Sequence, residues 1–321
     1  MRPFLQLWPR LVRRPLPARG RRRTLFHGAH APGPASRRGR LTAESIHLRS
    51  VELNEQRAPG GGFPFSVPAI RTLPHLELRT PVTCFVGDNG SGKSTLLEAI
   101  ALAARLPAVG SAELDRDETL AQQRRLGGAL RLGWRRRVHR GFFLRAEDFF
   151  GFTRRIAQLR AELEQRIDDV EREFADASDH TRGLARGPAA GSLAELTRRY
   201  GEDIDARSHG EAFLALFQSR LVPGGLYLLD EPEAALSPQS QLGLIALLAD
   251  SIPQQCQFVI ATHSPLLLAF PGATIFSFDL APIREVPFDE LQHVNLTRDF
   301  LNDPAAYLRH LVPRDVEERV T

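Results

Sequence analysis

An α/β fold with a mostly parallel sheet flanked by helices is predicted by three short runs of apolar and β-branched residues. These runs are Val82–Val86, Leu226–Leu229 and Gln257–Ala261, and each is followed by a polar segment. Continuous apolar runs are typical of parallel strands that are buried on both faces, whereas strands with one solvated face alternate apolar and polar residues. We therefore expect polar residues to gather at the carboxyl ends of the strands, where α/β proteins bind ligands.

The composition is that of an ordinary globular protein: 42% of the 321 residues are apolar and 25% are charged. The best apolar stretches, at residues 242–249 and 266–278, are too short for a bilayer span or are broken by Pro271 and Gly272. We therefore expect no membrane span and a cytoplasmic location. Cys84 and Cys256 lie in or beside strand-like runs, which indicates buried reduced thiols rather than disulfides or a cysteine-based metal site.

Residues 1–40 differ from the rest of the chain because they contain eleven Arg and no Asp or Glu. Subtracting these from the 42 basic residues leaves 31 against 38 acidic ones, so residues 41–321 carry a net charge of −7. The segment is also rich in Pro and Gly and lacks any sustained period, so we expect a disordered tail. An Arg-rich transit peptide, or an arm for nucleic acid or a membrane surface, are the alternatives. A short tail is also expected at residues 311–321.

Residues 87–95 match the phosphate-loop pattern G-x-x-x-x-G-K-[ST] in full, directly after the first predicted strand. The segment is Gly87-Asp88-Asn89-Gly90-Ser91-Gly92-Lys93-Ser94-Thr95, and Lys93 is the only lysine in the sequence. A helix predicted at residues 96–105 follows, so the backbone N–H groups of the loop would hold the β-phosphate of ATP at the positive end of the helix dipole. Lys93 would reach the β- and γ-phosphates, and the Ser94 hydroxyl would bind Mg²⁺.

A second ligand for Mg²⁺ is predicted at the end of the strand Leu226–Leu229. Asp230 and Glu231 follow this strand, and Asp230 lies 137 residues beyond Lys93 (230 minus 93). Asp230 would bind Mg²⁺ through a water, and Glu231 would act as general base toward the attacking water. Two acids after a strand also occur at ordinary surface turns, but their combination with the phosphate loop favours the catalytic interpretation.

Two further segments are candidates for nucleotide contact. Ser208, Gly210 and Glu211 precede a helix predicted at residues 212–221, and His263 follows the strand Gln257–Ala261. Each has a structural alternative, since Ser208 and Glu211 also form a helix capping box and a histidine at a strand end can be an ordinary loop residue. The capping and binding roles are compatible, because N–H groups at a helix start bind phosphate.

Together these segments resemble ABC-type ATPases of the P-loop NTPase class. The resemblance covers residues 41–310, and it is nearest to the stand-alone bacterial AAA family ATPases of the SMC, RecF and OLD-type branch. It implies that Ser208, Gly210 and Glu211 contact the γ-phosphate held by an opposite protomer, in an ATP-dependent homodimer that sandwiches the nucleotides. It also implies that His263 contacts the γ-phosphate in its own protomer.

One position departs from the family pattern. ABC ATPases carry a glutamine after the strand that follows the phosphate-loop helix, and residues 142–147 contain none; Arg145 and Glu147 stand there instead. The missing glutamine contacts the Mg²⁺ shell and couples transporter subunits to their membrane partners. Phe63 and Phe65 are candidates for stacking on adenine, with a core or loop position favoured for both.

An inserted helical subdomain is expected at about residues 107–207. Residues 124–145 contain eight Arg and no acid and predict two strands joined by a turn. This segment is either a solvated face, balanced by acids of the next helix, or a surface for nucleic-acid phosphates. The acids are Glu162, Glu164, Asp168 and Glu171.

The elements expected after the Arg-rich segment begin with a long helix at about 148–176. Apolar residues from Phe152 to Phe174 repeat there at three-to-four spacing, as one buried stripe of a lid or of a short coiled-coil arm. Residues 183–191 predict a linker, residues 274–279 a strand, and residues 297–310 a helix interrupted near Pro304.

The expected function is hydrolysis of ATP to ADP and phosphate, with Glu231, His263 and Lys93 as the catalytic residues. A second hypothesis is an ATP-gated module whose dimerisation grips DNA or a protein partner, with hydrolysis as a slow release. A transporter subunit is a third possibility, which the missing glutamine argues against.

Overall fold

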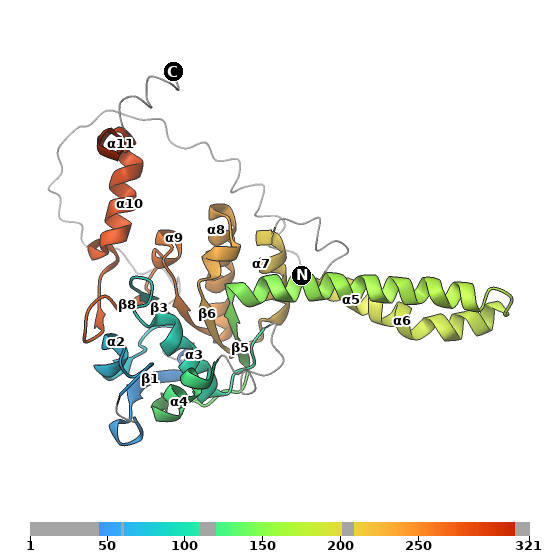
Figure 1. Cartoon of the computed structure of the whole chain (residues 1–321), viewed down its shortest axis with the longest axis horizontal. Helices are drawn as coiled ribbons and strands as arrows, with labels where there is room; N and C mark the ends of the chain where they lie inside the picture. The colour runs from blue at the N-terminus through green and yellow to red at the C-terminus, as the bar shows by residue number, and fades with distance from the viewer. Residues whose placement is uncertain (1–44, 59–60, 110–119, 201–208, 312–321) are drawn as a thin grey trace, which may run out of the picture. The chain divides into compact units, whose positions relative to one another are not determined.

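A six-stranded sheet with the strand order β5-β6-β7-β3-β8-β9 forms the centre of the computed structural model (Figure 1). Its strands are β3 (Val82–Val86), β5 (Gly141–Arg145), β6 (Leu226–Asp230), β7 (Gln257–Ala261), β8 (Thr274–Ser277) and β9 (Arg284–Glu285). All neighbours are parallel except β9, which is antiparallel to β8. The mostly parallel sheet predicted from the apolar runs is therefore confirmed.

The structure describes residues 45–58, 61–109, 120–200 and 209–311. The predictions for the tail at residues 1–40, for Ser208 and for residues 312–321 lie outside these ranges. Among the described residues no helix is both long and apolar enough to cross a bilayer.

Helices cover both faces of the sheet, because successive residues of its strands point to opposite sides. Cys84, Tyr227 and Ile260 pack on one face, and Phe85 and Leu228 pack on the other. The first face is covered by α7 (His209–Arg220), α8 (Pro238–Ser251), α9 (Pro265–Leu268) and α10 (Gln292–Asn302), and the second by α3 (Lys93–Ala104) and α4 (Ala121–Ala129). Both cysteines are buried free thiols, and burial raises the pKa of Cys84 to about 12.

A three-stranded antiparallel sheet packs on the α3 side and contains β1 (Leu48–Leu53), β2 (Leu76–Glu77) and β4 (Leu130–Trp134). Buried Gln257 joins it to the main sheet, since its Oε1 accepts from the N–H of His47 and of Leu48, each at 2.8 Å. The two strands predicted within residues 124–145 are confirmed as β4 and β5, but they do not pair with each other as a hairpin: β4 pairs with β1, whereas β5 pairs with β6. The reason is that Phe142, Phe143 and Leu144 form a continuous apolar run that is buried on both faces, as in a strand of a parallel sheet.

The long helix expected near residues 148–176 is confirmed as α5 (Ala146–Glu173), and it runs beside α6 (Asp179–Tyr200) as a hairpin (Figure 1). Its apolar stripe is only partly buried: Ile156 and Val170 are buried, but Leu159 is 41% exposed. The linker predicted at residues 183–191 is wrong, because these residues are helical within α6 despite Pro188. Packing against α5 and the good helix formers between the glycines stabilise the helix more than its glycines and Pro188 destabilise it.

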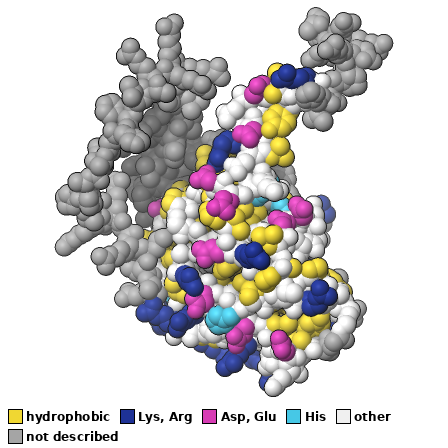
Figure 2. Space-filling view, turned by 90° about the vertical axis from the view of Figure 1, so that its left-hand side faces the viewer, with side chains coloured by type: hydrophobic (Ala, Val, Ile, Leu, Met, Phe, Trp, Pro, Cys, Tyr) yellow, Lys and Arg dark blue, Asp and Glu magenta, His cyan; other side chains and the backbone are white. Residues whose placement is uncertain are grey.

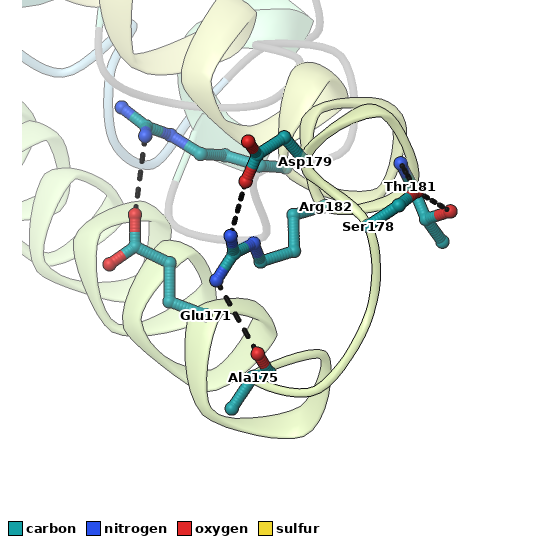
Figure 3. A network of polar contacts seen from close by, with 7 residues as sticks. Glu171, Ala175, Ser178, Asp179, Thr181 and Arg182 are labelled. Carbon is teal, nitrogen blue, oxygen red and sulfur yellow. Dashed lines mark hydrogen bonds and ion pairs between the residues drawn. The ribbon is translucent and has the colours of Figure 1, made fainter.

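Ion pairs within the hairpin use one of the acids, Glu171, that were expected to balance the Arg-rich segment (Figure 3). Glu171 on α5 pairs with Arg186 on α6 at 3.2 Å, and Arg182 at the tip pairs with Asp179. In the Arg-rich segment, Arg131 pairs instead with Glu52 at 3.4 Å. The expected balance by α5 acids is therefore corrected for these residues, and exposed pairs of this kind each contribute at most about 1 kcal/mol.

The chain beyond β8 agrees with the sequence prediction in outline. Helix α10 (Gln292–Asn302) begins earlier than expected, and α11 (Pro304–Leu311) follows the break at Pro304. Short 3-10 helices complete the fold, at Glu55–Arg57, Pro232–Ala235, Ile252–Gln254 and Phe288–Glu290, with the four-residue α2 at Pro68–Arg71.

Candidate functional site

The carboxyl ends of β3, β6 and β7 meet at one edge of the main sheet. β7 lies between the other two strands, and its last residue, Ala261, pairs with Phe85 of β3 and with Asp230 of β6. The loops that follow parallel strands lie at the same edge of the sheet, at the carboxyl ends of the strands. The phosphate loop, the Asp230-Glu231 pair and His263 are thereby brought together, although they are far apart in the sequence.

The phosphate loop ends in Gly92, which precedes α3 with a φ of 104°. A Cβ at this position would lie 3.0 Å from Val67 Cγ1, so both the backbone conformation and the space favour glycine. Lys93, the first residue of α3, is only 3% exposed, and its Nζ donates to the carbonyls of Gly87 (2.8 Å) and Asp88 (3.0 Å). Burial lowers the pKa of Lys93, and the nearby carboxylates, Glu231 first among them, oppose this shift.

Ser94 and Asp230 are in direct contact, as the Ser94 hydroxyl donates to Asp230 Oδ1 at 2.9 Å. Burial raises the pKa of Asp230 to about 7, and the charges of Glu98 and Glu231 act in the same direction, against the Ser94 hydrogen bond and Lys93. A hydroxyl and a carboxylate are ligands that Mg²⁺ prefers. The described residues contain no cluster of three or more His, Cys, Asp or Glu suited to a metal, so phosphate oxygens and water would have to complete the shell.

Glu231 occupies the left-handed region of backbone space, with φ 46° and ψ 49°, and this turns the chain away from β6. Such a conformation is unfavourable for glutamate and is found at functional sites. Glu231 Oε1 lies 3.7 Å from His263 Nε2. Glu233 Oε1 accepts from the backbone N–H of His263 at 2.6 Å, so the loop after β7 is held beside the end of β6.

Arg145, one of the two charged residues in the segment where the family's glutamine was expected, pairs by register with Asp230 at the end of the adjacent strand. Its guanidinium contacts Asp148 of α5 at 2.8 and 3.1 Å and Glu98 of α3 at 3.4 Å. All three side chains are at most 14% exposed. Arg145 therefore links the base of the hairpin to the phosphate-loop helix; the side chain of Glu147 lies outside the described set.

Gly210, at the start of α7, packs against α8 of its own chain. A Cβ on Gly210 would be 2.3 Å from Ser240 Oγ of α8, so packing within the protomer already requires glycine. Glu211 is exposed. Of the two aromatic candidates, Phe65 is buried in the core and Phe63 is 49% exposed.

The sequence analysis missed Asp279, Glu98 and His293. Asp279 follows β8, whose Ser277 pairs with Val86, and its Oδ1 accepts from the Asp88 N–H at 2.6 Å. A signal for Asp279 was present in the sequence, because the strand predicted at residues 274–279 ends in this acid. Glu98 and His293 have no local signal, because each stands alone in a helix and only tertiary packing brings it near the site.

Two family models match parts of this chain. The model described as "AAA domain, putative AbiEii toxin, Type IV TA system" matches residues 212–269, which include Asp230, Glu231 and His263. The model described as "AAA domain" matches residues 69–105, which include the phosphate loop. The two matches therefore coincide with the two halves of the site.

Among curated proteins, the hemin import ATP-binding protein HmuV of Nocardia farcinica (strain IFM 10152) is 30% identical over 245 residues, which are 75% of each chain. Solved structures that match include the SMC head domain from Thermotoga maritima, with 14% identity, 75% of this chain and 100% of that chain covered and a TM-score of 0.39. Another is cbiO1 from Clostridium perfringens, part of the ABC transporter complex cbiONQ, with 14% identity, 83% and 98% coverage and a TM-score of 0.42. On the relationship to HmuV, the chain belongs to the ABC-type P-loop ATPases.

Proposed function

We propose that this chain binds ATP with Mg²⁺ and hydrolyses it to ADP and phosphate. The strongest support is the 2.9 Å hydrogen bond from Ser94 Oγ to Asp230 Oδ1, which joins the phosphate loop to the acid at the end of β6. The two residues proposed to hold Mg²⁺ are thus adjacent, and the ion, when bound, would offset the charge of the β- and γ-phosphates.

The remaining residues act on the phosphates and the attacking water. Glu231 is the proposed base: it takes a proton from the water whose oxygen attacks the γ-phosphorus, while the bond from that phosphorus to its bridging oxygen breaks. His263, whose Nε2 is 3.7 Å from Glu231 Oε1, binds a γ-phosphate oxygen. Lys93 turns from the carbonyls of its own loop to the β- and γ-phosphates, and the N–H groups of residues 89–93 hold the β-phosphate.

A Lys93→Ala variant tests nucleotide binding. Loss of the ammonium leaves phosphate charge uncompensated, so calorimetry should detect little or no ATP binding. Arg166→Ala, which removes a positive charge from the exposed side of α5, is the control and should bind like the wild type. ATP affinity that is unchanged in Lys93→Ala would overturn the proposed function.

We also propose that the active form is a nucleotide-sandwich homodimer in the cytoplasm, where its buried free thiols would stay reduced. Gly210 lies against α8 of its own chain, so contact between its segment and a nucleotide calls for a second copy. Mixing Ser208→Arg with Lys93→Ala subunits tests this, because the mixed dimer has one site with both halves intact. Partial recovery of turnover from two inactive proteins is expected. Full turnover of Ser208→Arg alone as a monomer would contradict the composite site.

The α5–α6 hairpin favours a second candidate function, in which ATP-driven dimerisation grips a partner. Most of its described side chains are exposed, and the hairpin projects away from the main sheet (Figure 1). Figure 2 shows the side of the molecule that faces away from the hairpin, and there acidic side chains are interspersed with basic ones. Turnover measured with and without DNA tests this candidate; stimulation would favour it. A transporter subunit is the remaining candidate, favoured by the relationship to HmuV.

A further inference from the structure

Helix α10 carries a second histidine near its N-terminus. His293 is the second residue of α10, and its neighbours Leu291 (5% exposed) and Val294 (3% exposed) are anchored in the same core cluster as Leu267 and Ile275. α9 and α10 pack together, and α9 begins two residues after His263. The backbone at His293 is thus fixed between the loop after β7 and strand β8.

The surroundings of His293 belong to the nucleotide site. Asp279, at the end of β8, accepts the Asp88 N–H of the phosphate loop at 2.6 Å and would lie 3.0 Å from a Cβ on Gly87. Burial lowers the pKa of His293, the charge of His263 lowers it further, and the carboxylates of Asp279 and Asp88 oppose this. The charges that act on the imidazole thus come from three segments, and two of them, at Asp88 and Asp279, are joined by the 2.6 Å hydrogen bond at the phosphate loop.

The Nε2 atoms of His293 and His263 are both buried, and neither has a hydrogen-bond partner among the described residues. Burying a polar nitrogen without a partner is unfavourable, so such atoms call for an explanation. A phosphate oxygen that accepts a hydrogen bond from the imidazole would recover this cost. Lys93 and Ser94 lie at the other end of the phosphate loop, where α3 begins.

We propose that His293 is a nucleotide-binding residue, whose Nε2 donates to the terminal phosphate of a nucleoside triphosphate beside His263. This inference rests on the proposed ATP site, and it adds helix α10 to that site. It requires His293 to distinguish ATP from ADP, because ADP lacks the phosphate that the imidazole would contact.

The test compares the affinities of ADP and of the non-hydrolysable analogue β,γ-imido-ATP by calorimetry with Mg²⁺. His293→Ala should weaken binding of the triphosphate about tenfold, which is about 1.4 kcal/mol, while ADP affinity stays within about twofold. His293→Gln keeps a side-chain donor and should recover part of the affinity. His180→Ala, on the exposed hairpin, is the control.

Two results would overturn the inference: an unchanged triphosphate affinity in His293→Ala, or an equal loss for both nucleotides. Thermal melting without nucleotide identifies a folding defect, and if the Ala variant is unstable the Gln variant is compared with His293→Phe. Lys93→Ala separates the two proposals. If Lys93→Ala abolishes ATP binding and His293→Ala does not weaken it, only the role of His293 fails. If Lys93→Ala binds ATP normally, the ATP site itself fails.

Discussion

Ser94 Oγ and Asp230 Oδ1 are joined by a hydrogen bond of 2.9 Å across 136 positions of sequence. The hydroxyl stabilises the carboxylate, yet burial dominates and raises the pKa of Asp230 to about 7. The raised pKa favours the protonated form of Asp230 in the protein without nucleotide, so the stability of the fold should depend on pH.

Asp230→Asn should stabilise the nucleotide-free protein at pH 8 relative to the wild type. The folded pKa of Asp230, about 7, is above the reference value of 3.8, so the wild type loses stability as pH rises between these values. Asn does not ionise, so its advantage should grow from pH 5 to pH 8, toward an upper limit of about 4 kcal/mol. Urea unfolding at several pH values measures it, with exposed Asp250→Asn as control. Parallel stability curves for Asp230→Asn and wild type would contradict the prediction.

Glu98→Gln should lower stability by about 1–3 kcal/mol, because it removes the charged partner of buried Arg145 at 3.4 Å. The loss is limited because Asp148 still contacts the guanidinium. The charge of Glu98 also raises the pKa of Asp230, so the pH dependence of unfolding should move to lower pH in this variant. Glu162→Gln on the exposed face of α5 is the control. A variant as stable as wild type would show that the pair contributes nothing.

Glu231→Gln should retain ATP binding and lose turnover by about 100-fold or more, since glutamine can orient a water but cannot accept its proton. The trapped ATP state should elute as a dimer from a sizing column. Calorimetry and a phosphate-release assay measure the two effects. Wild-type turnover in this variant would assign the base to another residue, with Glu233 the next candidate.

Gly141→Ala should destabilise the protein by about 3 kcal/mol or more, or prevent folding. Gly141 has a φ of 122°, and a Cβ there would lie 1.8 Å from the carbonyl oxygen of Leu226. Gly151→Ala is the matched control: this glycine is in the interior of α5 with open space around it, so alanine should add up to about 1 kcal/mol. Equal melting temperatures for the two variants would contradict the assigned start of β5.

Sequence patterns predicted the parts of the fold whose signals are local. The apolar runs correctly predicted β3, β6 and β7, and the glycine-rich loop was correctly located between β3 and α3. Because parallel strands end at one edge, the proximity of Ser94 and Asp230 also followed from the motifs. Their roles in catalysis stay predictions.

Tertiary packing decided the features that local patterns predicted wrongly or missed. The glycines of residues 183–191 indicated a linker, but contact with α5 keeps them helical. The strands β4 and β5 follow each other in the sequence, which favoured pairing between them, yet they belong to different sheets. Asp279 and His293 reach the phosphate loop only through the pairing of β8 with β3 and the packing of α10, which no short motif encodes.

Helix α5 follows strand β5 directly, so a tilt at the base of the hairpin is transmitted along its whole length. Arg145 is the last residue of the strand and Ala146 the first of the helix, so no loop absorbs motion between them. A helix of 28 residues is about 42 Å long at about 1.5 Å per residue, so a tilt of about 5° at its base moves its far end by about 4 Å. Sub-ångström adjustments beside Asp230 would thus be amplified into a displacement large enough to make or break contacts at the tip.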